Sequence, residues 1–166
     1  MPNDSFSMEE KIKKRITDSA EALRRAEAWC AYQERCQQET RDKLYAWGLY
    51  PYLVENVIVE LITSGFINEE RFAEAYAGGK FRIKKWGRVK IKIELKKKKV
   101  SDYCIRKGLA VIDERDYHTT LKKLFELKSK LITEKHPLKR KYKVMQYLIS
   151  RGYEPDLVRE LFKEED

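Results

Sequence analysis

The chain is poor in the two residues that interrupt helices, with 7 Gly and 4 Pro among its 166 residues. No linker between the predicted elements is rich in Gly or Ser. Leu, Lys, Glu, Arg and Ala, which favour helix, are abundant instead. The composition therefore predicts an all-α protein, and the length allows one compact domain or a short array of small units.

Residues that usually carry catalysis or hold metals are scarce and lack the spacing that such sites need. The three cysteines, Cys30, Cys36 and Cys104, form no CxxC pair, and the 2 His lack ligand spacing. The sequence contains no Gly-rich phosphate loop, no HExxH motif and no GxSxG motif. We predict a protein without enzymatic activity, cofactor or metal, whose cysteines are small buried residues in a reducing compartment.

Long apolar runs are absent too. No segment approaches the roughly 20 apolar residues that a membrane span requires. The N-terminal stretch MPNDSFSMEEKIKKR has no apolar core of a signal peptide. We expect a cytoplasmic protein without membrane contact.

Positive charge, by contrast, is in excess and is concentrated in one segment. The net charge is +9 and the pI about 9.3. Residues 80–107 contain 13 Lys or Arg and 2 acids, a net of +11, so the rest of the chain nets −2. This imbalance indicates an acidic partner: nucleic acid, an acidic protein surface or an anionic membrane surface.

Three segments of the chain resemble one another. LYAWGL from Leu44, LKKKKV from Leu95 and LISRGY from Leu148 each place Gly or Lys four residues after the Leu, followed by an apolar residue. A period near fifty residues is typical of stacked supersecondary units. We predict a monomer with nine helices in three tandem three-helix repeats, stacked into an elongated, curved array. The predicted divisions are a flexible N-terminal segment at 1–18, repeat 1 at 19–64, repeat 2 at 65–112 and repeat 3 at 113–166.

The segment RVKIKIELKKKK in repeat 2 carries two conflicting signals. From Val89 to Leu95 apolar and polar residues alternate strictly, which taken alone predicts a strand. Superposing the repeats places Ile91 opposite Thr40 and Val144, and both flanking copies are predicted as helices. We therefore predict a helix in which Ile91 and Leu95 face inward.

The same segment supplies the strongest functional signal. Arg88, Lys92, Lys96 and Lys99 fall at i, i+4, i+8 and i+11 on one helical face, where they repel one another unless phosphates or carboxylates compensate. A solvated lysine-rich surface is the alternative interpretation. Trp86 is the candidate residue for stacking on bases. The predicted contact residues are Lys84, Lys85, Arg88, Lys92, Lys96, Lys97, Lys98, Lys99, Arg106 and Lys107. The members of a secondary basic patch are Lys139, Arg140, Lys141 and Lys143.

FINEERFAEAY at 66–76, then Trp86–Gly87 and IKIELKKKKV at 91–100, resemble the RecX family of regulatory proteins. AYQERCQQETRDKLYAWGL at 31–49 and KVMQYLISRGYEPDLVRELF at 143–162 are also similar to it, so the resemblance covers about residues 20–164. It implies tandem three-helix repeats. It also implies binding to the RecA recombinase filament, restraint of the ATPase, coprotease and strand-exchange activities of RecA, and weak DNA binding. Such a function belongs to homologous recombination, DNA repair and the SOS response.

Two departures from the family pattern lie in repeat 2. Lys99 stands where the pattern expects Gly, which puts a left-handed helix end in doubt there. Gly78–Gly79 replace larger residues and favour a bend in their helix. The helix boundaries of this repeat are therefore the least defined by sequence.

Three hypotheses follow for the partner. In the leading one, the basic face contacts single- or double-stranded DNA, weakly and with salt sensitivity, or acidic RecA surface. The protein would then inhibit RecA either by bridging neighbouring protomers in the filament groove or by blocking the growing end, and the sequence does not choose between the two. In the second, a helical protein binds DNA or RNA without RecA. The third, an amphipathic helix on a membrane surface, is disfavoured because the apolar residues at 89, 91, 93 and 95 are expected in the core.

Overall fold

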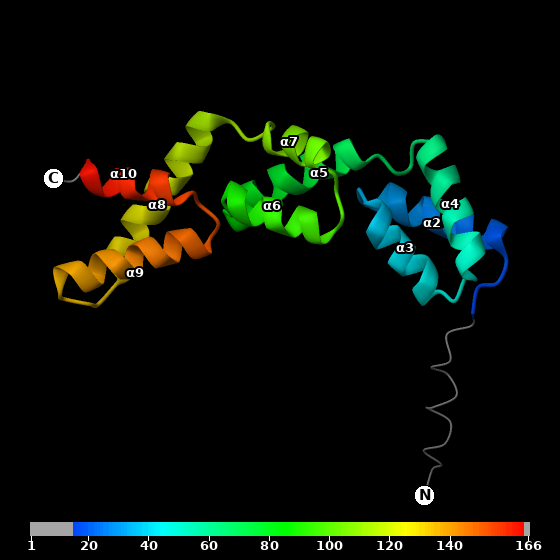
Figure 1. Cartoon of the computed structure of the whole chain (residues 1–166), viewed down its shortest axis with the longest axis horizontal. Coiled ribbons are helices and arrows are strands. Elements are labelled where there is room, and N and C mark those ends of the chain that lie inside the picture. Colours follow the sequence, from blue (N-terminus) through cyan, green and yellow to red (C-terminus); the bar gives the residue numbers. More distant parts are fainter. Residues whose placement is uncertain (1–14, 165–166) are drawn as a thin grey trace, which may run out of the picture. The chain divides into compact units, whose positions relative to one another are not determined.

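The computed structural model describes residues 15–164, which contain nine α-helices and one π-helix and no strand (Figure 1). The all-α prediction is confirmed. Contacts divide the chain into two compact units, one ending at Glu69 and the other beginning at Glu70. None of the helices in the described range is long and apolar enough to cross a membrane. The predicted repeat boundaries and the curvature of the array stay predictions.

The first unit contains repeat 1, formed by α2 (Ser19–Tyr32), α3 (Gln37–Ala46) and α4 (Pro51–Thr63). The Asp18 side chain caps α2 by accepting the Ala20 N–H at 3.2 Å, and Pro51 begins α4 without losing a helical hydrogen bond. The core of this unit is Ile16, Ala22, Ala26, Cys30, Leu44, Leu49, Val54, Val57, Ile58, Leu61 and Ile67.

The predicted flexible segment 1–18 overlaps the described part of the chain at residues 15–18. Ile16 is only 4% exposed and belongs to the core, and its N–H donates to the Trp47 carbonyl at 2.8 Å. Here the chain is packed because one apolar residue in a charged stretch reaches the core. Residues 1–14 lie outside the described residues.

None of the three cysteines, all of which the structure describes, forms a disulfide bond. Cys30 and Cys36 are buried as predicted, whereas Cys104 is half-buried. Burial raises the pKa of the Cys30 thiol, so this group stays protonated and unreactive near neutral pH.

Repeat 2 consists of α5 (Glu69–Gly79), the π-helix η1 (Lys80–Lys84), α6 (Arg88–Lys97) and α7 (Asp102–Leu109). The helix at 88–97 confirms the choice of helix over strand, and Ile91 and Leu95 are fully buried. Val89 and Ile93 are 40% and 49% exposed, so the expectation that they belong to the core is wrong. Side chains two residues apart on a helix point about 200° from each other. The alternating apolar residues therefore form two pairs, an inner one of Ile91 and Leu95 and an outer one of Val89 and Ile93.

The disturbance expected at Gly78–Gly79 takes the form of a change in helix type. The helix continues past Gly79 as η1 and ends at Lys85, whose φ of 58° is left-handed. The wider hydrogen-bond spacing of a π-helix is typical of single turns inserted into α-helices, often beside functional sites.

The left-handed end of α6 forms without glycine. Lys99 has a φ of 59°, its N–H donates to the Lys96 carbonyl at 2.9 Å, and the Val100 N–H donates to the Leu95 carbonyl at 3.2 Å. Gly48 and Gly152 have positive φ values at the corresponding positions of repeats 1 and 3. The doubt raised by Lys99 is thus resolved: the lysine adopts the same conformation.

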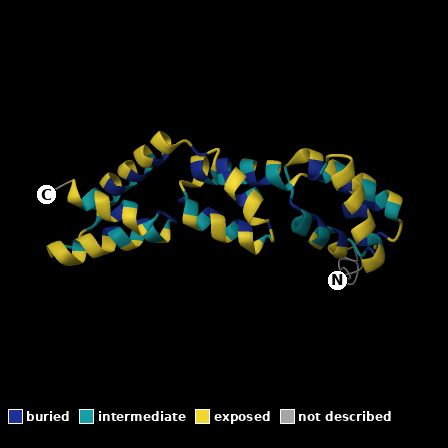
Figure 2. Ribbon diagram, turned by 45° about the horizontal axis from the view of Figure 1, so that its top comes forward, coloured by how far each residue is buried: buried dark blue, intermediate teal, exposed yellow. Residues whose placement is uncertain are grey.

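Repeat 3 consists of α8 (Glu114–Leu131), α9 (Pro137–Ser150) and α10 (Pro155–Lys163). Asp113 caps α8 through the Asp116 N–H at 3.0 Å, and Phe125 of α8 packs edge-on against Phe162 of α10 with ring centroids 5.0 Å apart. Figure 2 shows that helices in all three repeats have a buried side and an exposed side. Each repeat therefore leaves an outer surface free for partners.

Candidate partner-binding surface

We call three exposed lysines the lysine face: Lys92 and Lys96 on one side of α6, and Lys99 in the left-handed turn after the helix, where the predicted helical spacing no longer applies. The Lys96 ammonium lies 3.9 Å from the Asp102 carboxylate, which is a long, exposed and weak ion pair. Among the described residues, Lys92 and Lys99 have no carboxylate partner. The lysine face is therefore available to an external anion.

Arg88 shares this side of α6 by helical spacing, but its side chain is engaged within the protein. Its guanidinium donates to Glu154 at 2.8 Å and to Glu114 at 2.6 Å, and its Cζ lies 4.0 Å from the centre of the Tyr117 ring. The Tyr117 hydroxyl donates to Glu154 at 2.6 Å and accepts the Arg88 backbone N–H at 3.1 Å. Arg88 thus joins repeat 2 to repeat 3.

The pKa values of Arg88 and Tyr117 are both raised within this network. Burial alone lowers the pKa of Arg88, but hydrogen bonds and charge from Glu154 and Glu114 outweigh burial and raise it. Burial and the hydrogen bond to Glu154 raise the pKa of Tyr117. Both Arg88 and Tyr117 therefore keep their protons throughout the physiological range.

Backbone contacts complete the junction between repeats 2 and 3. The Gly87 N–H donates to the Arg151 carbonyl and the Val89 N–H to the Gly152 carbonyl, both at 2.9 Å. A Cβ at Gly87 would overlap the Gly152 carbonyl group, so only glycine permits this approach. The junction therefore satisfies N–H groups at the start of α6 that a phosphate would otherwise reach.

The remaining predicted contact residues are distributed over several elements. Lys84 and Lys85 are exposed at the end of η1, and their carbonyls accept hydrogen bonds from Arg151 and from the Tyr153 hydroxyl. Lys97 is exposed and pairs with Glu94 at 3.0 Å. The half-buried Lys98 has its ammonium 5.8 Å from the Tyr76 ring centre.

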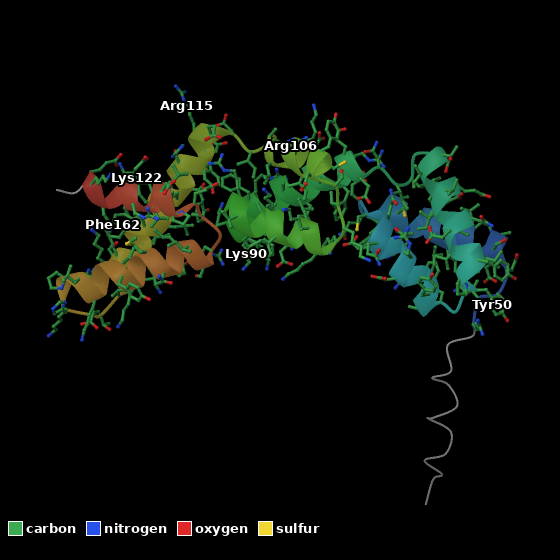
Figure 3. All side chains as sticks on the ribbon, in the orientation of Figure 1. Tyr50, Lys90, Arg106, Arg115, Lys122 and Phe162 are labelled. Carbon is green, nitrogen blue, oxygen red and sulfur yellow. The ribbon has the colours of Figure 1, made fainter. Side chains whose placement is uncertain are left out.

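Arg106 and Lys107 are exposed on α7, and Lys107 lies over the Tyr103 ring at 5.6 Å. In Figure 3, the labels of Arg106 and Lys90 stand at opposite edges of repeat 2. The predicted contact cations thus belong to several elements, η1, α6 and α7 among them, and not to one helical stripe.

Trp86, the candidate stacking residue, is half-buried beneath lysines. The ammonium groups of Lys80 and Lys90 lie 5.0 Å and 4.5 Å from the centre of the Trp86 ring. These cation–π contacts occupy the ring face that a base would need. Stacking on a base would therefore require the lysines to move.

The secondary basic patch is partly structural. Arg140 donates to the carbonyls of Ser129 and Ile132, and so secures the end of α8 against α9. Lys143 pairs with Glu134 at 3.1 Å. Lys139 and Lys141 are exposed, and Lys141 lies 5.1 Å from the Phe162 ring centre.

Sequence reasoning missed the acidic and aromatic partners of Arg88. Glu114 and Glu154 stand at helix starts, where a role in capping is sufficient to explain them. The repeat offers no clear signal either, because the position of Arg88 is Gln37 in repeat 1 but another cation, Lys141, in repeat 3.

Comparisons with known proteins agree with the repeat pattern. Residues 68–109 match the family model described as the second three-helix domain of RecX, and residues 115–162 match its third three-helix domain. "Regulatory protein RecX" of Clostridium perfringens (strain 13) is 34% identical over 74% of this chain. The chain spans 58% of that relative's length. "Regulatory protein RecX" of Prosthecochloris aestuarii is 28% identical over 89% of this chain and 95% of its own.

Solved structures share the fold. The crystal structure of RecX from Lactobacillus salivarius has a TM-score of 0.77 and 22% identity, covering 88% of this chain and 95% of the other. A second crystal structure of regulatory protein RecX has a TM-score of 0.79 and covers 88% of this chain and 71% of the other.

Proposed function

The chain belongs to the RecX family of regulatory proteins, and we propose that it binds the RecA–DNA filament and inhibits RecA. The observation that carries the proposal is the lysine face, because two of its three cations have no carboxylate partner among the described residues. Phosphates of filament DNA or carboxylates of RecA would compensate this charge.

The junction between repeats 2 and 3 supports a mechanism in which the protein acts by binding alone. Backbone hydrogen bonds and the Arg88 network hold the two repeats together, so a contact made through α6 is transmitted to repeat 3. We propose that the protein lies along the filament groove and bridges neighbouring RecA subunits. Bridging would hinder the subunit motions that ATP turnover, coprotease activity and strand exchange require. We therefore also propose a cytoplasmic location, where the filament forms.

The experiment is RecA ATPase on single-stranded DNA, with the full chain added across a salt series. Lys92→Glu, Lys96→Glu and Lys99→Glu together should weaken inhibition by at least about tenfold, because opposite charges replace the available cations. Arg88 is left unchanged because its loss would disturb the junction.

The matched control is Lys122→Glu, Lys123→Glu and Lys130→Glu on α8, which makes the same charge change at exposed positions. The control should inhibit like the unmodified protein. Equal losses in both triple variants, at unchanged helical circular dichroism, would remove the lysine face from the mechanism.

The alternative, a protein that binds DNA or RNA without RecA, makes a different prediction. It requires tight binding to a DNA or RNA oligonucleotide alone and a steep loss of affinity with salt, since every neutralised phosphate releases a counterion. Weak oligonucleotide binding combined with RecA inhibition would favour the filament.

A further inference from the structure

The outer face of α6 carries an apolar pair in the midst of lysines. Val89 and Ile93 lie one turn apart and are 40% and 49% exposed, while Ile91 and Leu95 form the buried side of the same helix. A surface helix needs one apolar side to pack on its own core. The outer pair is therefore surplus to the packing of repeat 2.

Cations border this pair on both sides. Helical geometry places Lys92 and Lys96 along one side of it and Lys97 along the other. The α6 segment RVKIKIELKK has five basic residues and one acid. An apolar centre within a charged rim is the arrangement of a protein interface.

The chemistry of the pair selects among partners. Nucleic acid is held through its phosphates by cations, and two aliphatic side chains add nothing to that contact. A second copy of the same face would bring lysines against lysines. An acidic protein segment with apolar residues at helical spacing satisfies both the aliphatic pair and the lysines.

We propose that Val89 and Ile93 dock an acidic amphipathic segment of a protein partner, whose carboxylates pair with Lys92, Lys96 and Lys97. The inference rests on the proposed function and deepens it. It makes RecA protein, and not the DNA of the filament, the partner of this face. The apolar pair supplies specificity, because charge alone accepts any polyanion.

The test uses the full chain and two synthetic helical peptides. One peptide carries Leu at i and i+4 bordered by Glu, and the other has the same Glu residues with Ser in place of Leu. The Leu peptide should bind the unmodified protein. Val89→Ser with Ile93→Ser should weaken that binding about tenfold, because the apolar area no longer buried is equivalent to about two methylene groups. The Ser peptide should bind weakly and equally to both proteins.

A thymidine oligonucleotide is the third probe. Its affinity should be unchanged in the double Ser variant, because the lysines remain. Val89→Ala with Ile93→Ala serves as a second variant that favours helix, so loss of binding can be separated from loss of folding. The matched control is Leu127→Ser with Leu131→Ser on α8, a pair at the same spacing that is 59% and 73% exposed.

Three results would overturn the inference. They are equal binding of the Leu and Ser peptides, an equal loss of peptide binding in the α8 control, and an oligonucleotide affinity that falls with the peptide affinity. RecA ATPase measured with the unmodified protein tests the proposed function separately. Peptide binding without RecA inhibition would refute that function and leave the docking surface supported.

Discussion

The turns that end α6 and α9 have the same backbone conformation but different surroundings. Lys99 and Gly152 both have positive φ values, 59° and 100°. A Cβ at Gly152 would overlap the Cβ of Lys90 and lie 2.8 Å from the Lys90 backbone nitrogen. The Lys99 side chain, by contrast, is exposed. The turn of repeat 3 is covered by the start of α6, and the turn of repeat 2 is open.

The difference separates two reasons for glycine at a helix end. The left-handed conformation comes from hydrogen bonds that close the helix, and a lysine can adopt it at a moderate cost. Glycine becomes obligatory only where another backbone approaches the turn. An open turn with Lys thus marks a surface that faces outward, and the lysine face ends at this turn.

The largest effect is expected from filling the contact between the covered turn and the start of α6. Gly87→Ala should lower the free energy of unfolding by about 3 kcal/mol, because its Cβ would overlap the Gly152 carbonyl group and neither backbone can move freely. Gly87 has a φ of −78°, which alanine adopts easily, so the effect reports contact alone. Urea denaturation followed by circular dichroism measures it.

Gly79→Ala is the matched control for this substitution. A Cβ at Gly79 meets nothing within 4 Å, and the residue has helical dihedral angles, so alanine should raise stability by up to about 1 kcal/mol. Similar destabilisation by both substitutions would mean that close approach to Gly152 is not what requires glycine at position 87.

A smaller loss is expected from cutting the side-chain network that accompanies the covered turn. Arg88→Ala leaves the Glu154 carboxylate without its cation in a half-buried site, and should cost about 2 kcal/mol. Arg41→Ala removes the pair with Glu55, which is 56% exposed, and should cost about 0.5 kcal/mol. Equal costs in thermal or urea unfolding would contradict the structural role of Arg88.

The sequence predicts the scaffold far better than it predicts the use of its charges. Helix positions follow from local signals such as Asp113 at a helix start, and the repeat rightly outweighs the strand-like alternation around Ile91. Helical spacing also puts Arg88 in line with Lys92 and Lys96. Spacing cannot reveal that Glu154, 66 residues later in the chain, neutralises one of these cations and leaves Lys92 exposed. Pairing of charges depends on how repeats pack, and that information is distant in sequence.

The smallest effect is expected at the open turn that ends α6. Lys99→Gly should raise the free energy of unfolding by up to about 1 kcal/mol relative to Lys99→Ala, because glycine adopts the left-handed region without steric cost. Urea denaturation of the two variants isolates backbone conformation, since both lack the charge. If repeat 2 keeps Lys at this position for its partner, both variants should inhibit RecA less than the unmodified protein, although one of them is more stable. A gain in stability without a loss of inhibition would instead leave the lysine at this turn without a role in binding, and would restrict the contact to the body of α6.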